Sequence, residues 1–502
     1  MDDDNKDVSI IQTYTLDASG TSVNVRIYRS ADEYVPIYEV TIQGIGTATK
    51  LLLLSFRPEL ISTVPLDTTR LGEREYRDEM KQHYVDTSNV LIDKYLPGTP
   101  EGIKQLLISY IINMMLGLGD LEVPLSDPNL EEIAVNSSKD FIWVFHRQYY
   151  WCKTNIKLRN EEDIYEKAEQ IGRGVGREIN NLAPLMDAEL NDGSRVNATL
   201  FPISQSGNTI TIRKFSKNPW TMPALIRANT ISPNIAGLIW ACIENEISLL
   251  IAGGTASGKT SFLNAMSIFF PPNRRIISVE ETRELTLPTF LQWVPMVTRS
   301  PNPEGKGEIT LHDLTVNALR QRPDIIMVGE IRVKKDAETM FEAIHTGHSV
   351  YGTVHADNAS DAIIRMSNSP IDIPKIVLNA LGGIIVQFRH RAKGIRRVLE
   401  FAEILKTGDS SVYYRWNIRN DSFSQVGDII RLSETLSMYT GLTKREIEDD
   451  VAARAQVLTW MAQKNVMNVD DSGMVVAQYY RNKSKVLQAV QDNAAFSLDL
   501  FK

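Results

Sequence analysis

A glycine-rich segment near the middle of the chain has residue types and a spacing that suit phosphate binding. It fits the pattern G-x-x-x-x-G-K followed by Ser or Thr, in which backbone N–H groups close around phosphates at the start of a helix. The lysine of this pattern reaches the β- and γ-phosphates, and the last hydroxyl binds Mg²⁺. The residues are Gly253, Gly254, Thr255, Ala256, Ser257, Gly258, Lys259 and Thr260. The segment therefore predicts a site for a nucleoside triphosphate and Mg²⁺.

The residues on either side favour this prediction over a chance match in a glycine turn. Residues 247–252 are mostly apolar and short enough for a buried strand, and residues 261–266 are typical of a helix. A strand, a glycine-rich loop and a helix, in this order, form the context in which the pattern binds nucleotides.

Two more apolar segments, both after the loop, end in acidic residues. Residues 275–279 are followed by Glu280 and Glu281, and residues 324–329 are followed by Glu330. The carboxyl ends of parallel strands meet at the nucleotide, so we expect Glu280 and Glu330 near the γ-phosphate and its Mg²⁺. Carboxylates there can hold the metal's water ligands or orient the attacking water. The alternative is a turn or capping acid after each strand, which is less favoured for two acids beside one phosphate-binding loop.

Three of the seven histidines lie close together, at His345, His348 and His355. Residues 350–354 are typical of a strand, so His355 follows a strand end as the two acids do. A zinc site is not favoured, because no cysteine lies nearby and the spacing fits no common zinc pattern. We expect a structural role for His345, and phosphate sensing or a contact to the transition state for His348 and His355.

Composition limits the class of protein. The 502 residues are 43% hydrophobic and 23% charged, as in a globular protein of about three domains. The net charge of −8 gives no overall basic surface for nucleic acid, so a DNA motor is less favoured. Cys152 and Cys242 are far apart and form neither a disulfide framework nor a zinc motif. The acidic start of the chain is unlike a signal peptide and no apolar run is long enough to cross a bilayer, so we expect a cytoplasmic protein.

The remaining patterns divide the chain into regions. Residues 5–45 alternate like β-strands, and the residues from there to about 120 read as helices without a catalytic pattern, which indicates a structural or partner-docking region. The next region, to about residue 219, has a helix over 161–174 capped by Asn160. Its Arg195 and Arg213 would, by themselves, be solvated surface arginines.

The C-terminal region is predicted to be helical from Ser433 onward. Thr443 and Glu446 have the spacing of a capping box, and apolar residues follow at helical intervals.

The order of these motifs resembles the type II/type IV secretion ATPase superfamily over residues 121–425. Its Walker A, Asp, Walker B and His boxes match the glycine-rich loop, residues 279–284, residues 329–332 and residues 346–355. The N-terminal region and the helical tail look like those of the archaeal branch, which serves type IV pilus-like machines, including the archaellum, and related secretion systems. Glu281 stands where the family usually has aspartate, and the four-cysteine zinc motif of bacterial type II enzymes is absent, so no structural zinc is expected.

The resemblance implies an α/β fold with a RecA-like P-loop ATPase core preceded by an α+β N-terminal domain. An N-terminal extension and a C-terminal helical region would complete the chain. The implied boundaries are 1–120, 121–222, 223–425 and 426–502. The family further implies a homo-hexamer that binds ATP between the α+β domain and the RecA-like domain.

The resemblance also implies roles for single residues. Glu280 would be the catalytic carboxylate, Glu330 the Walker B acid that assists Mg²⁺ and water, and His348 and His355 the His-box pair. Thr260 would share the metal with Glu330.

Two residues before the core also acquire a role through the resemblance. Arg195 and Arg213 match the arginines of the family's N-terminal domain that reach the nucleotide phosphates. Guanidinium groups suit the charge that develops on a transferred phosphoryl group.

The function that we expect is Mg²⁺-dependent ATP hydrolysis, peripheral at the inner face of the cell membrane. The resemblance implies that closing and opening of the domains moves a polytopic membrane platform protein, which assembles or secretes pilin-like subunits. One alternative is a RecA-like nucleic-acid translocase, which DNA or RNA would stimulate. Less favoured alternatives are a nucleotide-gated scaffold that hydrolyses little ATP and a small-molecule P-loop kinase.

Overall fold

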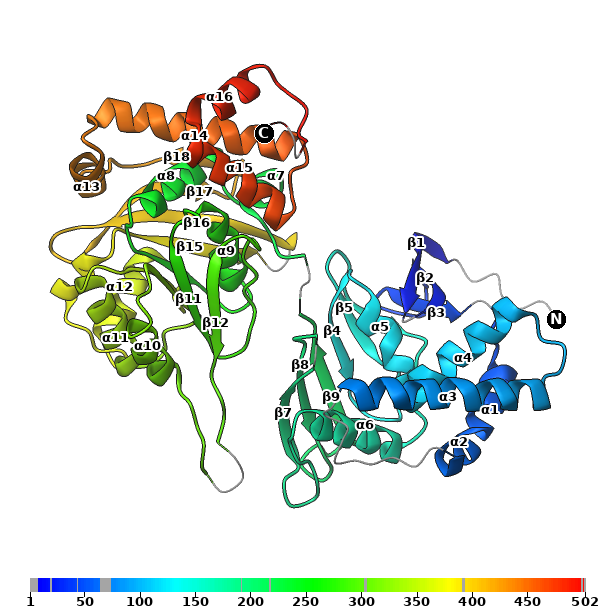
Figure 1. Ribbon diagram of the computed structural model, residues 1–502. Helices are drawn as coiled ribbons and strands as arrows, with labels where there is room; N and C mark the ends of the chain where they lie inside the picture. Colours follow the sequence, from blue (N-terminus) through cyan, green and yellow to red (C-terminus); the bar gives the residue numbers. More distant parts are fainter. Residues whose placement is uncertain are drawn as a thin grey trace. The chain divides into compact units, whose positions relative to one another are not determined.

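The chain forms two compact units, Met1–Lys217 and Asn218–Lys502, which we call unit 1 and unit 2 (Figure 1). The computed structural model describes all residues except 1–7, 19, 43, 64–73, 191, 216–217, 302–304, 391–392, 498–499 and 501–502. Each unit has its own sheet and hydrophobic core. The division into four parts that the resemblance implies stays a prediction.

Nine strands in the described part of unit 1 form one sheet, in the order β1-β2-β3-β6-β5-β4-β9-β8-β7. They are β1 (Ser9–Ala18), β2 (Thr21–Arg29), β3 (Ile37–Ile42), β4 (Leu130–Val135), β5 (Trp143–His146), β6 (Tyr150–Thr154), β7 (Leu185–Glu189), β8 (Arg195–Thr199) and β9 (Thr209–Arg213). Strand β3 pairs in parallel with β6, so the strands of the N-terminal region extend the sheet of the residues after 121. The buried carboxylate of Asp127 accepts hydrogen bonds from the hydroxyls of Tyr14 and Tyr38, which joins the same two regions.

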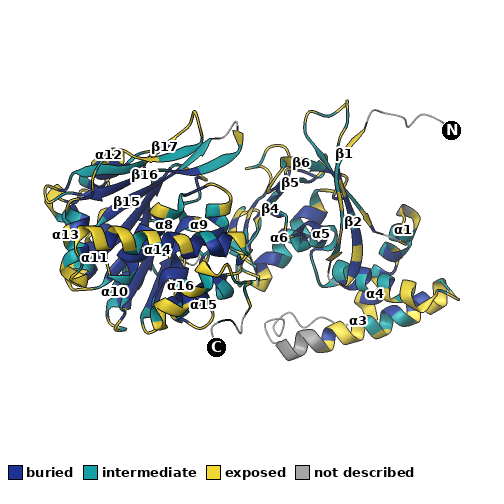
Figure 2. Cartoon of the chain, turned by 90° about the horizontal axis from the view of Figure 1, so that it is seen from above, coloured by how far each residue is buried: buried dark blue, intermediate teal, exposed yellow. Residues whose placement is uncertain are grey.

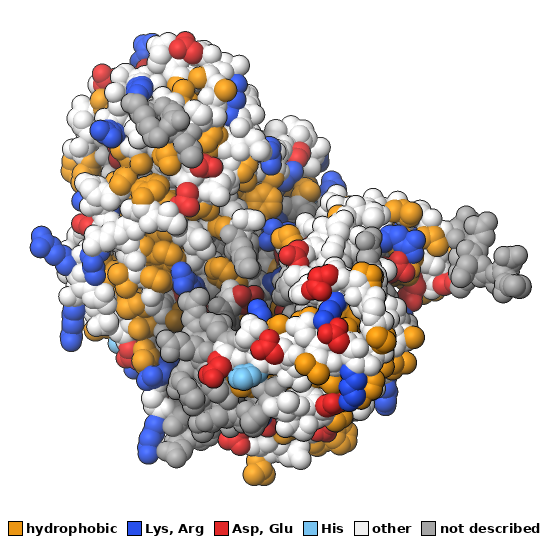
Figure 3. All heavy atoms as spheres, turned by 45° about the vertical axis from the view of Figure 1, so that its right-hand side comes forward, with side chains coloured by type: hydrophobic (Ala, Val, Ile, Leu, Met, Phe, Trp, Pro, Cys, Tyr) orange, Lys and Arg blue, Asp and Glu red, His pale blue; other side chains and the backbone are white. Residues whose placement is uncertain are grey.

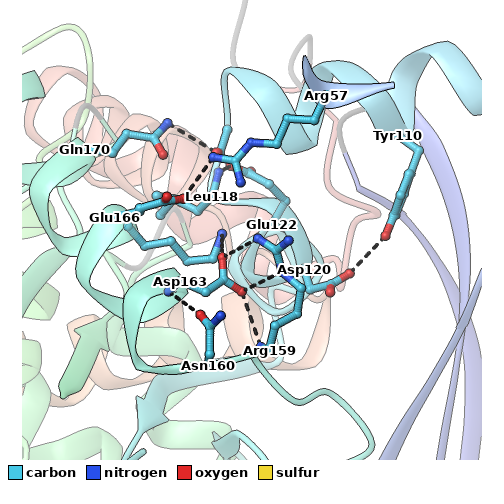
Figure 4. Close-up of polar contacts among 12 residues, drawn as sticks. Arg57, Tyr110, Leu118, Asp120, Glu122, Arg159, Asn160, Asp163, Glu166 and Gln170 are labelled. Atoms are coloured by element: carbon cyan, nitrogen blue, oxygen red, sulfur yellow. Dashed lines mark hydrogen bonds and ion pairs between the residues drawn. The ribbon is translucent and has the colours of Figure 1, made fainter. Parts of the chain in front are cut away.

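Helices of unit 1 pack beside this sheet and are tied together by polar contacts. They are α1 (Thr47–Ser55), α2 (Arg57–Thr63), α3 (Arg74–Tyr95), α4 (Glu101–Met115), the short 3₁₀ helix η1 (Gly119–Leu121), α5 (Glu122–Ser126) and α6 (Glu161–Gly174). Helix α6 begins as predicted, because the side chain of Asn160 accepts a hydrogen bond from the N–H of Asp163 at 2.8 Å. Figure 4 shows how α6 is fastened, with Asp163 paired to Arg159 at 3.1 Å and Glu166 paired to Arg57 at 2.8 Å.

Nine strands in the described part of unit 2 form a second sheet, in the order β12-β11-β13-β14-β10-β15-β16-β17-β18. They are β10 (Leu249–Gly253), β11 (Arg275–Glu280), β12 (Gln292–Val297), β13 (Ile325–Val328), β14 (Ser349–Val354), β15 (Gly383–His390), β16 (Ile395–Ile404), β17 (Ser410–Asn417) and β18 (Ser422–Gln425). The strands from β12 to β15 run parallel, and β16 to β18 continue the sheet as antiparallel hairpins.

Helices cover both faces of this second sheet, and its central strands are buried between them (Figure 2). They are α7 (Met222–Arg227), α8 (Pro233–Glu244), α9 (Lys259–Met266), η2 (Ser267–Phe269), α10 (Leu311–Leu319), α11 (Lys334–His345), α12 (Ala359–Ser367), η3 (Lys375–Ala380), α13 (Arg431–Thr440), α14 (Lys444–Gln463), α15 (Val469–Arg481) and α16 (Lys483–Gln491). Alternate residues of β10 face the core with α8 and α9 on one side and the core with α10 to α12 on the other. The predicted α/β class is confirmed.

The C-terminal helices α13 to α16 pack on the core that also contains α8 and α9. Thr443 and Glu446 form the predicted capping box at the start of α14. Arg454 of α14 is buried, forms ion pairs with Asp450 and Glu244, and lies 5.1 Å from the centre of the Trp240 ring. Burial would lower the pKa of Arg454, but the two carboxylates outweigh this effect and raise it.

We also searched the described helices for membrane spans. No single one is both long and apolar enough to span a membrane, whereas Glu101–Met115 and Gly119–Ser126 pass by length and composition only as a pair bent by 107°.

Candidate functional site

The glycine-rich segment connects β10 to α9 in unit 2, as the sequence predicts. Gly258 is the N-cap of α9 with φ of +97°, a conformation that favours glycine. At Gly253 a Cβ atom would lie 2.4 Å from Ser257 Oγ and 2.6 Å from the Gln387 carbonyl oxygen, so only glycine fits there. The loop therefore ends at the positive end of a helix, where backbone N–H groups can bind an anion.

The lysine of the segment lies against the loop. Lys259 Nζ donates hydrogen bonds to the carbonyl oxygens of Gly253 at 3.0 Å and Gly254 at 3.3 Å. Burial lowers the pKa of this ammonium, and the charge of Arg332 adds to the fall. The carboxylates of Glu330, Asp357 and Glu284 oppose it, with Glu330 having the largest effect and Glu284 the smallest. The residues present thus fit a triphosphate, because a cation and a helix N-terminus are held within one turn of each other.

The first acid, Glu280, ends β11 and is 2% exposed. Its Oε1 accepts hydrogen bonds from the backbone N–H groups of Glu284 at 2.9 Å and Leu285 at 3.1 Å. Glu280 therefore fixes the loop that follows β11 and sets the position of Glu284.

Glu284 is a residue that the motif analysis did not single out. It belongs to the same segment of the sequence, and its carboxylate is one of those that act on the pKa of Lys259. The missing signal was the position of the loop after β11, where the backbone N–H of Glu284 is bonded to Glu280.

The second acid, Glu330, follows β13 and is linked to the first acidic segment through an arginine. Arg332 Nη1 lies 2.6 Å from Glu281 Oε1, and Arg332 Nη2 lies 3.0 Å from Glu330 Oε2. The Glu330 carboxylate is also the charge that most strongly opposes the fall in the pKa of Lys259. The structure thus gives Glu281 a partner that sequence reasoning did not identify.

Only one histidine of the predicted pair reaches the loop within unit 2. His355 follows β14, and its Nε2 lies 3.0 Å from Thr255 Oγ1. His348 precedes β14, and its Nδ1 contacts the Ala343 carbonyl oxygen at 3.0 Å. Since β14 runs parallel to β10 and six residues of strand span about 20 Å, the two histidines are not brought together.

Two of the predicted site residues, Thr260 and Glu330, are the candidates for binding a metal ion. Thr260 is half-buried in the first turn of α9, next to Lys259. Within the described ranges, no group of three or more His, Cys, Asp and Glu side chains is arranged to hold a metal ion. A Mg²⁺ ion bound here would rely on Thr260, Glu330 and the phosphates of the nucleotide, as is usual for this ion.

Arg195 and Arg213 lie in unit 1, directly opposite each other on β8 and β9. Two like charges at one register position are unfavourable unless a negative group is near. Glu132 of β4 also pairs with Arg213 in the register, and Arg213 opposes the rise in the pKa of this glutamate that burial causes. A role of the two arginines at the nucleotide stays a prediction.

Comparison with known proteins gives consistent matches. Residues 121–393 match the family model described as type II/IV secretion system protein. The uncharacterized protein MJ0900 of Methanocaldococcus jannaschii is 34% identical over 77% of this chain and 72% of its own length. MJ0781 of the same organism, also uncharacterized, is 27% identical over 97% of this chain and 90% of its own. The solved structure of the Legionella pneumophila ATPase DotB is 18% identical with a TM-score of 0.43, covering 72% of this chain and 95% of that one.

Proposed function

Because the chain belongs to the type II/IV secretion system protein family, a family of secretion ATPases, we propose that it hydrolyses ATP with Mg²⁺ to drive a secretion or pilus machine. The observation that carries the proposal is the arrangement in unit 2, where Lys259 and the helix N-terminus at Gly258 lie near Glu330. Positive groups for the phosphates and a carboxylate for metal and water are the parts that phosphoryl transfer requires.

The residues act mainly by position and charge. Backbone N–H groups at the start of α9 bind the phosphates, and Lys259 exchanges the carbonyl oxygens of its own loop for phosphate oxygens. Mg²⁺, when bound, would neutralise phosphate charge next to Thr260. His355, held by Thr255, is placed to contact the γ-phosphate.

Two carboxylates have distinct parts in this proposal. Glu330 assists the metal and its water, while Glu284 orients the attacking water. Glu280 was predicted to be the catalytic carboxylate, and we propose that it serves the reaction by holding Glu284 through the backbone hydrogen bond. Arg332 holds Glu281 and Glu330 together by pairing with both.

The finer parts of the proposal rest on the family. We infer a homo-hexamer in which Arg195 and Arg213 complete the nucleotide site, and a polytopic membrane platform protein as partner at the inner face of the membrane. The two Methanocaldococcus relatives support the archaeal branch, whose machines assemble pilin-like subunits, pili or archaella. His348 would take part in ATP hydrolysis only through a contact with a residue outside unit 2.

A protein partner also fits the surface better than nucleic acid does. The net charge is −8, and on the face shown in Figure 3 basic side chains are interspersed with acidic and hydrophobic ones. Nucleic-acid motors instead need a concentrated basic surface to neutralise phosphates.

The test of the proposed activity is ATP hydrolysis with and without Mg²⁺ by the full chain and by Lys259→Ala. We expect Mg²⁺-dependent turnover that the substitution abolishes, because alanine removes the ammonium group that the loop holds next to the phosphates. Turnover retained by Lys259→Ala would place the active site elsewhere.

A further inference from the structure

A second side chain from another strand lies against the phosphate-binding loop. Arg396 on β16 donates from Nε to the carbonyl oxygen of Ala256 at 3.3 Å. Its Cδ lies 3.5 Å from the position that a Cβ would take at Gly258. One hydrogen bond and the closeness of Cδ to Gly258 therefore place this arginine beside the loop.

Arg396 meets the loop at a carbonyl oxygen, not at the N–H groups that bind an anion. In a phosphate-binding loop the backbone N–H groups bind the phosphates, so this contact leaves those groups available. Ala256 has φ of +58°, a left-handed conformation that belongs to this tight winding of the loop. Arg396 is thus bonded to the middle of the loop, at Ala256, and comes from a different strand than the residues assigned to the phosphates.

The sheet order determines which end of a nucleotide emerges there. Strand β10 lies between β14 and β15. Glu280 ends β11, Glu330 follows β13 and His355 follows β14, and all three strands lie on the β14 side of β10. In the proposed site the γ-phosphate and metal therefore belong to that side. The nucleoside end must then leave the loop on the opposite side, toward β15 and β16, where Arg396 lies.

The chemistry of arginine suits the flat face of a base. A guanidinium group is planar, is weakly hydrated and stacks on aromatic rings, which an ammonium group does less well. Arg389 stands directly opposite Arg396 in the strand pair, so its charge discourages the Arg396 guanidinium from turning toward β15. The next residue, Arg397, is bound differently, with Nε and Nη2 both 2.7 Å from the carboxylate of Asp421.

We propose that Arg396 binds the nucleoside end of the nucleotide, with its guanidinium group stacked on the base. This inference rests on the proposed nucleotide site and adds the residue that distinguishes a nucleotide from a bare polyphosphate. It assigns a binding role to the β15–β16 hairpin, which the motif analysis left without one.

The test compares two ligands that share three phosphates, ATP and inorganic tripolyphosphate, by calorimetric titration in the presence of Mg²⁺. We expect Arg396→Ala to weaken ATP binding roughly tenfold and to change tripolyphosphate binding by less than about twofold, as for loss of one stacked base. Arg396→Lys should resemble Arg396→Ala, because lysine keeps the charge but lacks the planar guanidinium group. The matched control is Lys393→Ala, which removes an exposed charge from the same hairpin and should change neither affinity.

Each other outcome overturns the inference in a recognisable way. Equal weakening of both ligands would place the contact on the phosphates or on the loop itself. Normal ATP affinity in Arg396→Lys would show that the charge of Arg396, not its planar group, binds the nucleotide. Unchanged ATP binding by Arg396→Ala would show that Arg396 does not bind the nucleotide. A full chain that binds neither ligand would instead refute the proposed nucleotide site, without bearing on Arg396 alone.

Discussion

At the scale of single residues, we propose that the two carboxylates at and after the end of β11 divide positioning and catalysis between them. Glu280 is buried and its Oε1 accepts two backbone N–H groups, whereas Glu284 lies close enough to Lys259 to oppose the fall of that residue's pKa. A side chain engaged with backbone N–H groups stabilises a loop, and we propose that the neighbouring Glu284 orients the attacking water.

We predict that Glu284→Gln lowers kcat at least about a hundredfold, as expected for loss of a general base or water-orienting carboxylate. Glu280→Gln retains an oxygen that can accept the same N–H groups and should lose less than about tenfold, while Glu280→Ala should lose far more. Steady-state kcat and KM for ATP check this. If Glu280→Gln is as inactive as Glu284→Gln, the prediction is wrong and Glu280 is the catalytic carboxylate.

The sequence identifies the residues of the site better than it identifies their contacts. The loop from Gly253 to Thr260 follows from local spacing, and its strand and helix are where the pattern predicts them. His355 reaches the loop because strand ends converge, a rule that needs no coordinates. Arg332 and Arg396 act through contacts between segments far apart in the sequence, and no local pattern specifies such contacts.

At the scale of elements, local sequence patterns predict where helices begin. They do not predict which strands pair when those strands lie far apart in the sequence. Asn160 caps α6, and Thr443 and Glu446 cap α14, because each cap is decided within four residues. The pairing of β3 with β6 joins residues more than a hundred positions apart, and alternation alone cannot choose a partner strand.

The junction between α14 and α8 provides a prediction at this scale. Arg454→Ala leaves the carboxylates of Asp450 and Glu244 without their buried cation, so we expect the free energy of unfolding of unit 2 to fall by about 3 kcal/mol. Urea denaturation followed by tryptophan fluorescence measures it, since Trp240 lies beside Arg454. Arg419→Ala, at an exposed position, is the matched control and should change it by less than about 0.5 kcal/mol. Equal effects of the two substitutions would show that the buried ion pairs do not stabilise the junction.

At the scale of the whole molecule, we propose a motor whose subunits complete one another. Unit 2 contains the loop, the acids and His355, while Arg195 and Arg213 stand opposite each other in unit 1. Arginines that approach the phosphates stabilise charge in the transition state, so activity should depend on how units meet in an assembly.

The central claim is tested most directly by ATP hydrolysis per chain, with Mg²⁺, as a function of protein concentration, with Glu330→Gln measured in parallel. Our account predicts that specific activity rises with concentration as the chains assemble, and that the variant is inactive at every concentration although it assembles equally well. Specific activity that stays constant while light scattering reports a monomer would contradict the motor and favour a self-contained nucleotide enzyme.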